Sequence, residues 1–171
     1  SVEGEAFSAS KMRVTLSVEP GEDYALAIVP KGRPFPEQVR IAYGDMIRMG
    51  TFEMRTAPEP GDYDLIYVFD PFGVSREDVR IPLEIKPSDI SLNAPRSVQA
   101  GRNFNVRWTG PALDDHVIVL GEAGNLSNRE RVAWLTSGGI VTLQAPDVPG
   151  SYELRYEEDY TPLSIVPIEV K

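Results

Sequence analysis

Residues 57–67 read APEPGDYDLIY, and residues 145–156 read APDVPGSYELRY. The two segments share the frame Ala-Pro-acid followed by Pro-Gly-x-Tyr-acid-Leu-x-Tyr, and Gly150 lies 89 positions after Gly61 (150 − 61). Weaker matches follow in the same order on either side of this frame. They relate residues 23–28 to 115–120, 51–54 to 141–144, and 81–86 to 166–171. Ordered matches at one period indicate an internal duplication.

Each repeat carries the patterns of β-strands. Residues 104–109 and 152–157 alternate apolar with polar side chains, which is the period of a strand with one buried face. The apolar members are expected to face the core, and they are Phe104, Val106, Trp108, Tyr152, Leu154 and Tyr156. The charged members of the second segment are expected on the solvated face, and they are Glu153, Arg155 and Glu157.

Residues 24–29 and 117–120 are continuously apolar, as the central strands of a sandwich can be. Residues 31–38 and 122–130 are irregular and fall in equivalent places, which predicts a long loop in each repeat. No window longer than about ten residues keeps helical spacing. Short strands at this spacing predict an all-β fold of two tandem immunoglobulin-like antiparallel β-sandwiches.

The Pro-Gly-x-Tyr step predicts a tight corner in each repeat. The glycine is expected to supply a turn residue with positive φ. Tyr63 and Tyr152 are expected to bond their hydroxyl groups back to the preceding backbone, as tyrosines do at the corner of immunoglobulin-like sandwiches. We expect the domains to span residues 1–86 and 87–171, because Pro87 interrupts the chain after the last strand of the first repeat.

Composition excludes several classes of function. The formal net charge of −9 comes without any Lys/Arg cluster, which argues against binding to nucleic acid. No apolar run approaches the ~18 residues of a membrane helix, so no membrane insertion is expected. The chain has no cysteine, which excludes thiolate metal sites and cysteine nucleophiles. A first residue of Ser1 rather than Met is typical of a processed or trimmed chain.

No arrangement of residues predicts catalysis, a cofactor or a metal site. His116 is the only histidine, so neither a zinc site nor a histidine-based triad can be assembled from several histidines or cysteines. We interpret it as a surface or structural histidine. The two acidic groups, Asp114-Asp115 and Glu157-Glu158-Asp159, lack the spacing of a calcium loop and are interpreted as solvated edges.

Aromatic residues in or beside the predicted loops are the candidates for partner binding. Residues 69–73 and 159–162 occupy the same hairpin position in the two repeats, between the last two strands. Immunoglobulin-like domains often place recognition in such loops. Equally, these aromatic residues could cap the core or the seam between domains. The candidates are Phe69, Phe72, Trp134 and Tyr160, with Phe35 in a long loop of the first repeat.

The second repeat resembles the immunoglobulin-like repeat modules of bacterial envelope proteins, some of which accompany von Willebrand type A domains. The resemblance rests on Ala100-Gly101, on FNVRWTGP at 104–111, on Asp115 and on residues 145–156. The same frame has a fainter likeness to SKICH-type sandwiches. The first repeat lacks the Trp-Thr-Gly-Pro segment and a counterpart of residues 90–95, so its first strand is either supplied by residues 2–9 or missing.

The resemblance implies a fold and a recognition role and carries no catalytic residue. The sequence therefore favours a non-enzymatic, extracytoplasmic module that recognises a protein partner or acts as a spacer. One alternative is an accessory or inhibitory subunit of a partner enzyme. The other is a carbohydrate-binding module that stacks sugars on Trp134 or Tyr160.

Overall fold

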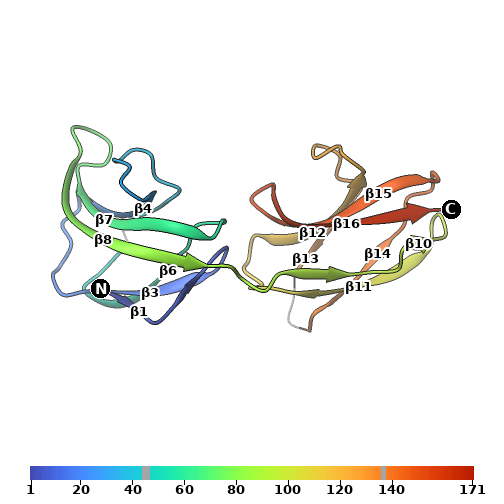
Figure 1. Cartoon of the computed structure of the whole chain (residues 1–171), viewed down its shortest axis with the longest axis horizontal. Coiled ribbons are helices and arrows are strands. Elements are labelled where there is room, and N and C mark those ends of the chain that lie inside the picture. The colour runs from blue at the N-terminus through green and yellow to red at the C-terminus, as the bar shows by residue number, and fades with distance from the viewer. Residues whose placement is uncertain (44–46, 136–137) are drawn as a thin grey trace. The chain divides into compact units, whose positions relative to one another are not determined.

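The computed structural model describes residues 1–43, 47–135 and 138–171. These residues form strands joined by turns and loops, in two compact units, Ser1–Ser88 and Asp89–Lys171 (Figure 1). We call them unit 1 and unit 2. Within the described ranges, no helix is long and apolar enough to cross a membrane.

Unit 1 is a sandwich of two sheets. Its strands are β1 (Val2–Glu3), β2 (Ala6–Phe7), β3 (Lys11–Leu16), β4 (Tyr24–Pro30), β5 (Arg40–Tyr43), β6 (Gly50–Arg55), β7 (Gly61–Phe69) and β8 (Arg76–Lys86). One sheet has the order β1-β3-β6 and the other the order β2-β8-β7-β4-β5. Neighbouring strands are antiparallel except β2 and β8, which are parallel.

Unit 2 repeats this plan. Its strands are β9 (Ser91–Asn93), β10 (Ser97–Val98), β11 (Asn103–Thr109), β12 (His116–Glu122), β13 (Arg131–Trp134), β14 (Ile140–Gln144), β15 (Gly150–Glu158) and β16 (Thr161–Val170). The sheets have the orders β9-β11-β14 and β10-β16-β15-β12-β13, again with one parallel pair, β10 and β16. The predicted fold class is confirmed: each unit is an immunoglobulin-like β-sandwich.

The open question about the first strand of unit 1 is resolved in favour of residues 2–9. β1 joins the three-stranded sheet beside β3, and β2 joins the five-stranded sheet beside β8. β9 and β10 make the same switch between sheets in unit 2. The start of each sandwich is thus shared between its two sheets.

Each unit has its own core between its sheets. In unit 2 the predicted inward face of β11 is confirmed, because Phe104, Val106 and Trp108 are all buried. The predicted tyrosine corners are confirmed as well. The Tyr63 hydroxyl donates to the Glu59 carbonyl at 3.1 Å, and the Tyr152 hydroxyl donates to the Val148 carbonyl at 3.0 Å. Of the two corner glycines, Gly61 has the expected positive φ, at 152°, whereas the φ of Gly150 lies outside the left-handed range.

One predicted match between the repeats is wrong by a single residue. Relating residues 51–54 to 141–144 sets Phe52 against Thr142, yet Phe52 is buried and Thr142 is exposed. The inward residues of β6 and β14 are related instead by the 89-residue offset of the two corner glycines, so Phe52 corresponds to Val141 (141 − 52). A shift of one residue turns every side chain of a strand to the opposite face, so burial distinguishes the two matches.

The central strands of each five-stranded sheet, β4 and β7 in unit 1 and β12 and β15 in unit 2, have buried residues on both faces. In unit 1 a small apolar cluster of Ala27, Val29, Ile66 and Val68 lies apart from the main core, with Phe35 of the loop 31–38 packed against it. In unit 2 the residues that correspond to Ile66 and Val68 at the 89-residue offset are Arg155 and Glu157. Both are buried, as are Glu153 and Glu158. The prediction that Glu153, Arg155, Glu157 and Glu158 face solvent is therefore wrong.

Candidate binding surfaces

The hairpin between β15 and β16 presents an exposed tyrosine. The hairpin loop consists of Asp159 and Tyr160, whose φ values of 47° and 66° are those of a primed two-residue turn. Such turns favour Gly or Asn, because a bulky side chain at positive φ is strained. Tyr160 nevertheless holds this position and is 76% exposed. Unfavourable local geometry retained at an exposed aromatic residue is typical of a functional position.

Arg129 and Trp134 extend this surface over the outer face of unit 2. The Arg129 guanidinium lies 4.6 Å from the centre of the Tyr160 ring and also bonds to Glu157. Trp134, at the end of edge strand β13, pairs with Val117, which pairs with Glu157 in turn, so these side chains share one face of the sheet. Trp134 is 63% exposed. We call Arg129, Trp134 and Tyr160 the aromatic surface of unit 2.

A buried ionic cluster lies behind this surface and holds the loop 123–130. The Arg155 guanidinium donates to Glu157 Oε1 at 2.7 Å and to Glu153 Oε1 at 3.0 Å. It also donates to loop carbonyls, the shortest of these bonds being 2.6 Å to Asn128. A buried charge is tolerated only when its hydrogen-bonding capacity is filled in this way. The cluster therefore fixes the loop from which Arg129 reaches Tyr160.

Of the two interpretations of His116, as a surface or a structural histidine, the structure supports the structural one. It is fully buried at the start of β12, and its Nδ1 lies 3.0 Å from the Tyr156 hydroxyl. Its Nε2 lies 4.0 Å from Glu158. Burial raises the pKa of Tyr156 above its ordinary value, so this hydroxyl stays protonated at neutral pH. Unit 1 places a stacked pair of tyrosines, Tyr24 and Tyr67, at the corresponding positions.

The aromatic residues of the unit 1 hairpin divide into one packed and one exposed side chain. Phe69 ends β7 half-buried, with its ring centre 5.2 Å from that of Tyr24. Phe72 lies in the turn and is 81% exposed, in edge-on contact with Tyr43 of β5 at 5.6 Å. The two hairpins thus each carry one strongly exposed aromatic residue, Phe72 in unit 1 and Tyr160 in unit 2.

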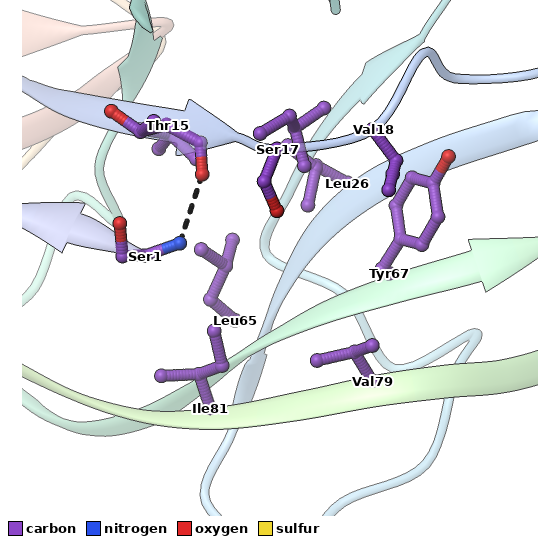
Figure 2. A pocket seen from close by; sticks show the side chains of 11 residues that line it. Ser1, Thr15, Ser17, Val18, Leu26, Leu65, Tyr67, Val79 and Ile81 are labelled. Atoms are coloured by element: carbon purple, nitrogen blue, oxygen red, sulfur yellow. Dashed lines mark hydrogen bonds between the residues drawn. The ribbon is translucent and has the colours of Figure 1, made fainter. Parts of the chain in front are cut away.

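Unit 1 also contains an apolar pocket of ≈ 230 Å³ (Figure 2). Leu16 of β3 lies on one side, and side chains of β4, β7 and β8 lie opposite, among them Leu26, Leu65 and Ile81. Val18 and Val79 at the pocket are about half-exposed, at 56% and 49%. The lining is mostly apolar and also includes Ser1, Thr15, Ser17 and the phenol of Tyr67.

Neither Arg129 nor the pocket was found from the sequence. Arg129 has no local pattern that marks it. The only signal for the cluster behind it is that the second repeat places charged residues where the first has Ile66 and Val68. Among the described residues, no group of three or more His, Cys, Asp or Glu side chains is arranged to hold a metal ion.

No protein-family model matches the chain, and no curated protein matches it in sequence. Among solved structures it is similar to domains 3 and 4 of rat CD4, at 10% identity and a TM-score of 0.35, with 98% of each chain covered. The BSP domain of a biofilm-associated protein is 14% identical with a TM-score of 0.38, covering 99% of this chain and 29% of that one. The three N-terminal domains of the outer capsid protein Hoc of bacteriophage RB49 are 12% identical with a TM-score of 0.34, covering 97% and 55%. The fold assignment rests on the strand order and register given above.

Proposed function

We propose that the chain is a non-enzymatic, extracytoplasmic recognition module, and that unit 2 binds a protein partner through Arg129, Trp134 and Tyr160. The observation that carries this proposal is Tyr160, exposed at a positive φ that its side chain disfavours. The extracytoplasmic location is supported by the resemblance of the second repeat to modules of bacterial envelope proteins.

The chemistry of the aromatic surface suits a protein partner. Trp, Tyr and Arg are the residues most enriched among those that dominate binding energy at protein interfaces. The Arg129 guanidinium is already held by Glu157 and by the Tyr160 ring, so little side-chain freedom is lost when a partner binds. Edge strand β13 adds unpaired backbone groups beside Trp134 for further hydrogen bonds.

Phe72 of unit 1 is the second contact that we propose for a partner. It holds the equivalent hairpin position and is equally exposed. Phe69 is the weaker candidate, because its ring packs against Tyr24 and lies 5.1 Å from the Arg76 guanidinium. We therefore assign Phe69 to supporting the hairpin.

The test is capture of partners from an envelope extract of the source organism, comparing the wild type with Tyr160→Gly and Trp134→Ala. Glycine adopts positive φ without strain, so Tyr160→Gly should leave the melting temperature unchanged or slightly raised. We expect this variant to lose at least about tenfold in affinity for the captured protein, as hot-spot residues do. Phe72→Ser is the matched change in the other hairpin and separates the contributions of the two units.

Two outcomes would count against the proposal. Undiminished capture by both Tyr160→Gly and Trp134→Ala would show that the aromatic surface is not the contact. Binding of the wild type to a glycan array, lost in Trp134→Ala, would assign the surface to carbohydrate instead.

A further inference from the structure

Strand β13 forms one edge of the five-stranded sheet of unit 2. It is the last strand in the order β10-β16-β15-β12-β13, so only one of its two edges pairs with another strand of the chain. Its ladder with β12 keeps an unbroken register from Arg131 to Trp134. Proline, charged side chains and bulges usually keep such an edge from pairing with a second chain. None of these features interrupts the segment Val132, Ala133 and Trp134.

The other comparable edges are shorter or partly covered. The opposite edge of the same sheet is β10, which has two residues and offers little to a second chain. In unit 1 the equivalent edge strand is β5, where Tyr43 pairs with Ala25 as Trp134 pairs with Val117. Tyr43 has the ring of Phe72 against it at 5.6 Å. Among the described residues, no aromatic ring makes such a contact with Trp134.

The free edge of β13 carries the backbone groups of Val132 and Trp134. The Leu135 amide donates to the His116 carbonyl at 3.2 Å, so Leu135 directs its backbone groups towards β12. The backbone groups of an antiparallel strand alternate between its two edges. Ala133 therefore also faces β12, whereas the amides and carbonyls of Val132 and Trp134 point away from it.

The side chains of the same two residues are apolar and exposed. Val132 is 43% exposed and Trp134 is 63% exposed. Both lie on the outer face of the sheet, whereas Ala133 between them packs against the core of unit 2. The edge thus combines outward hydrogen-bonding groups with apolar side chains that the unit itself leaves uncovered.

We infer that this edge pairs with the same edge of a second copy of the chain. The two β13 strands run antiparallel, with Ala133 of one copy opposite Ala133 of the other. Val132 of each copy then faces Trp134 of the other, and these outward residues form two hydrogen-bonded pairs. An aromatic ring beside a β-branched side chain is a favourable cross-strand pair. Arg131 falls opposite Leu135, so no two charged side chains meet along residues 131–135.

The choice of a second copy follows from the symmetry of this pairing. A two-fold axis brings the same patch of both subunits together, so the patch must be complementary to itself. Sliding one strand by two residues places Val132 against itself and Trp134 against Glu130. Sliding it the other way places Trp134 against itself and Val132 beyond Leu135. Only the register centred on Ala133 joins the two apolar side chains in both pairs.

This inference goes beyond the proposed function. Cross-strand neighbours lie on one face of a sheet, so the outer faces of both copies point the same way. The pair therefore presents two aromatic surfaces side by side, and a partner with two binding sites gains avidity from them. Because the edge is short, we expect a weak pair that is half-formed at about 0.1 mM.

Sedimentation equilibrium of the full chain, from about 0.01 to 1 mM, measures the pairing. Val132→Pro removes an amide that points to the free edge, and edge strands tolerate proline at such a position. We expect this variant to weaken the dimer at least about tenfold, while the melting temperature in dilute solution stays within a few degrees of the wild type. Val132→Lys places a charge at the edge and should have the same effect.

Tyr160→Gly is the matched control for the proposed function. Tyr160 lies outside β13, so this variant should dimerise like the wild type even where it loses the captured partner. Conversely, Val132→Pro keeps Arg129, Trp134 and Tyr160. Failure of the dimer and failure of the partner surface are therefore seen in different variants.

The register has its own test, because the chain contains no cysteine. The two Ala133 residues form a non-hydrogen-bonded pair, whose Cα atoms lie about 4.5 Å apart, within reach of a disulfide. Ala133→Cys should give disulfide-linked dimers in oxidised glutathione. The two Val132 residues are diagonal neighbours about 7–8 Å apart, so Val132→Cys should remain monomeric on a non-reducing gel.

Three results would overturn the inference. The first is a wild type that stays monomeric at about 1 mM. The second is a dimer that both Val132→Pro and Val132→Lys leave intact, because the contact would then lie elsewhere. The third is crosslinking through Val132→Cys in place of Ala133→Cys, because the strands would then pair in another register.

Discussion

Arg155 carries a charge in an environment from which water is excluded. Its side chain is fully buried, and it bridges Glu153 and Glu157 while bonding three carbonyls of the loop 123–130. Ile66 holds the same position in unit 1 inside an apolar cluster. The same position in the sandwich thus accepts either an aliphatic or a charged side chain, provided that hydrogen bonds and ion pairs satisfy the charged group.

At this residue scale we predict that Arg155→Ala lowers the stability of unit 2 by about 3–5 kcal/mol, because it removes the guanidinium that lies between the buried Glu153 and Glu157 and leaves three loop carbonyls without their donor. The double variant Arg155→Ile with Glu157→Val copies the pair Ile66 and Val68 of unit 1 and should lose less than the single variant. Urea denaturation measures both. A single variant as stable as the wild type would show that the ion pairs contribute nothing at this site.

At the scale of elements, a carboxylate of the five-stranded sheet accepts a backbone amide from the long loop in each unit. Asp64 accepts the Gly32 amide at 2.8 Å and the Arg80 guanidinium at 2.6 Å, and Glu153 accepts the Gly124 amide at 3.1 Å. The Gly32 hydrogen bond, together with the Arg80 charge, holds the pKa of Asp64 below its ordinary value. The charged form of Asp64 therefore stabilises the loop 31–38 on the sheet.

We predict that unit 1 loses stability in acid, because Asp64 must be ionised to hold both the Gly32 amide and the Arg80 guanidinium. The folded-state pKa of Asp64 lies below its unfolded value of about 4, so its contribution is complete above that pH and is lost as the pH falls through the folded value. Asp64→Asn should cost about 1–3 kcal/mol at pH 7 and flatten the decline of stability below pH 4. Thermal unfolding from pH 7 to pH 2 measures this. An unchanged pH profile in the variant would contradict it.

At the scale of the whole molecule, we propose that residues 1–86 and 87–171 are domains that fold independently. Each has its own hydrophobic core, which a domain of this size needs in order to fold alone, and each also has its own tyrosine corner. Ser88 bonds twice to Ser8 of unit 1, its hydroxyl donating to the Ser8 carbonyl at 2.5 Å. Because of these bonds, the stability of a fragment should depend on whether it ends at residue 86 or at residue 88.

We predict that fragments 1–88 and 87–171 each unfold cooperatively in calorimetry, and that fragment 1–86 is less stable than 1–88 by about 1–2 kcal/mol, because two hydrogen bonds are lost. Ser88→Ala in the longer fragment should reproduce about half of this difference. A fragment that remains unfolded alone would contradict independent folding of that domain.

The sequence by itself determined the features that depend on neighbouring residues. Alternation at 104–109 placed Phe104, Val106 and Trp108 inward, because a strand turns successive side chains to opposite faces. The repeated Pro-Gly-x-Tyr step located both tyrosine corners, because the hydroxyl reaches a carbonyl four residues earlier. The repeat also placed the two hairpins and the two long loops at equivalent positions.

Tertiary structure alone decided what covers each face. The alternation at 152–157 gave no sign that the loop 123–130 returns over the outer face of the sheet and buries Arg155 and Glu157. Strands β3, β4, β7 and β8 likewise meet at the apolar pocket of unit 1, and no local pattern in the sequence brings residues of these four strands together. Burial is set by segments far away in the chain, and a two-residue period records which face a side chain takes but not what packs against that face.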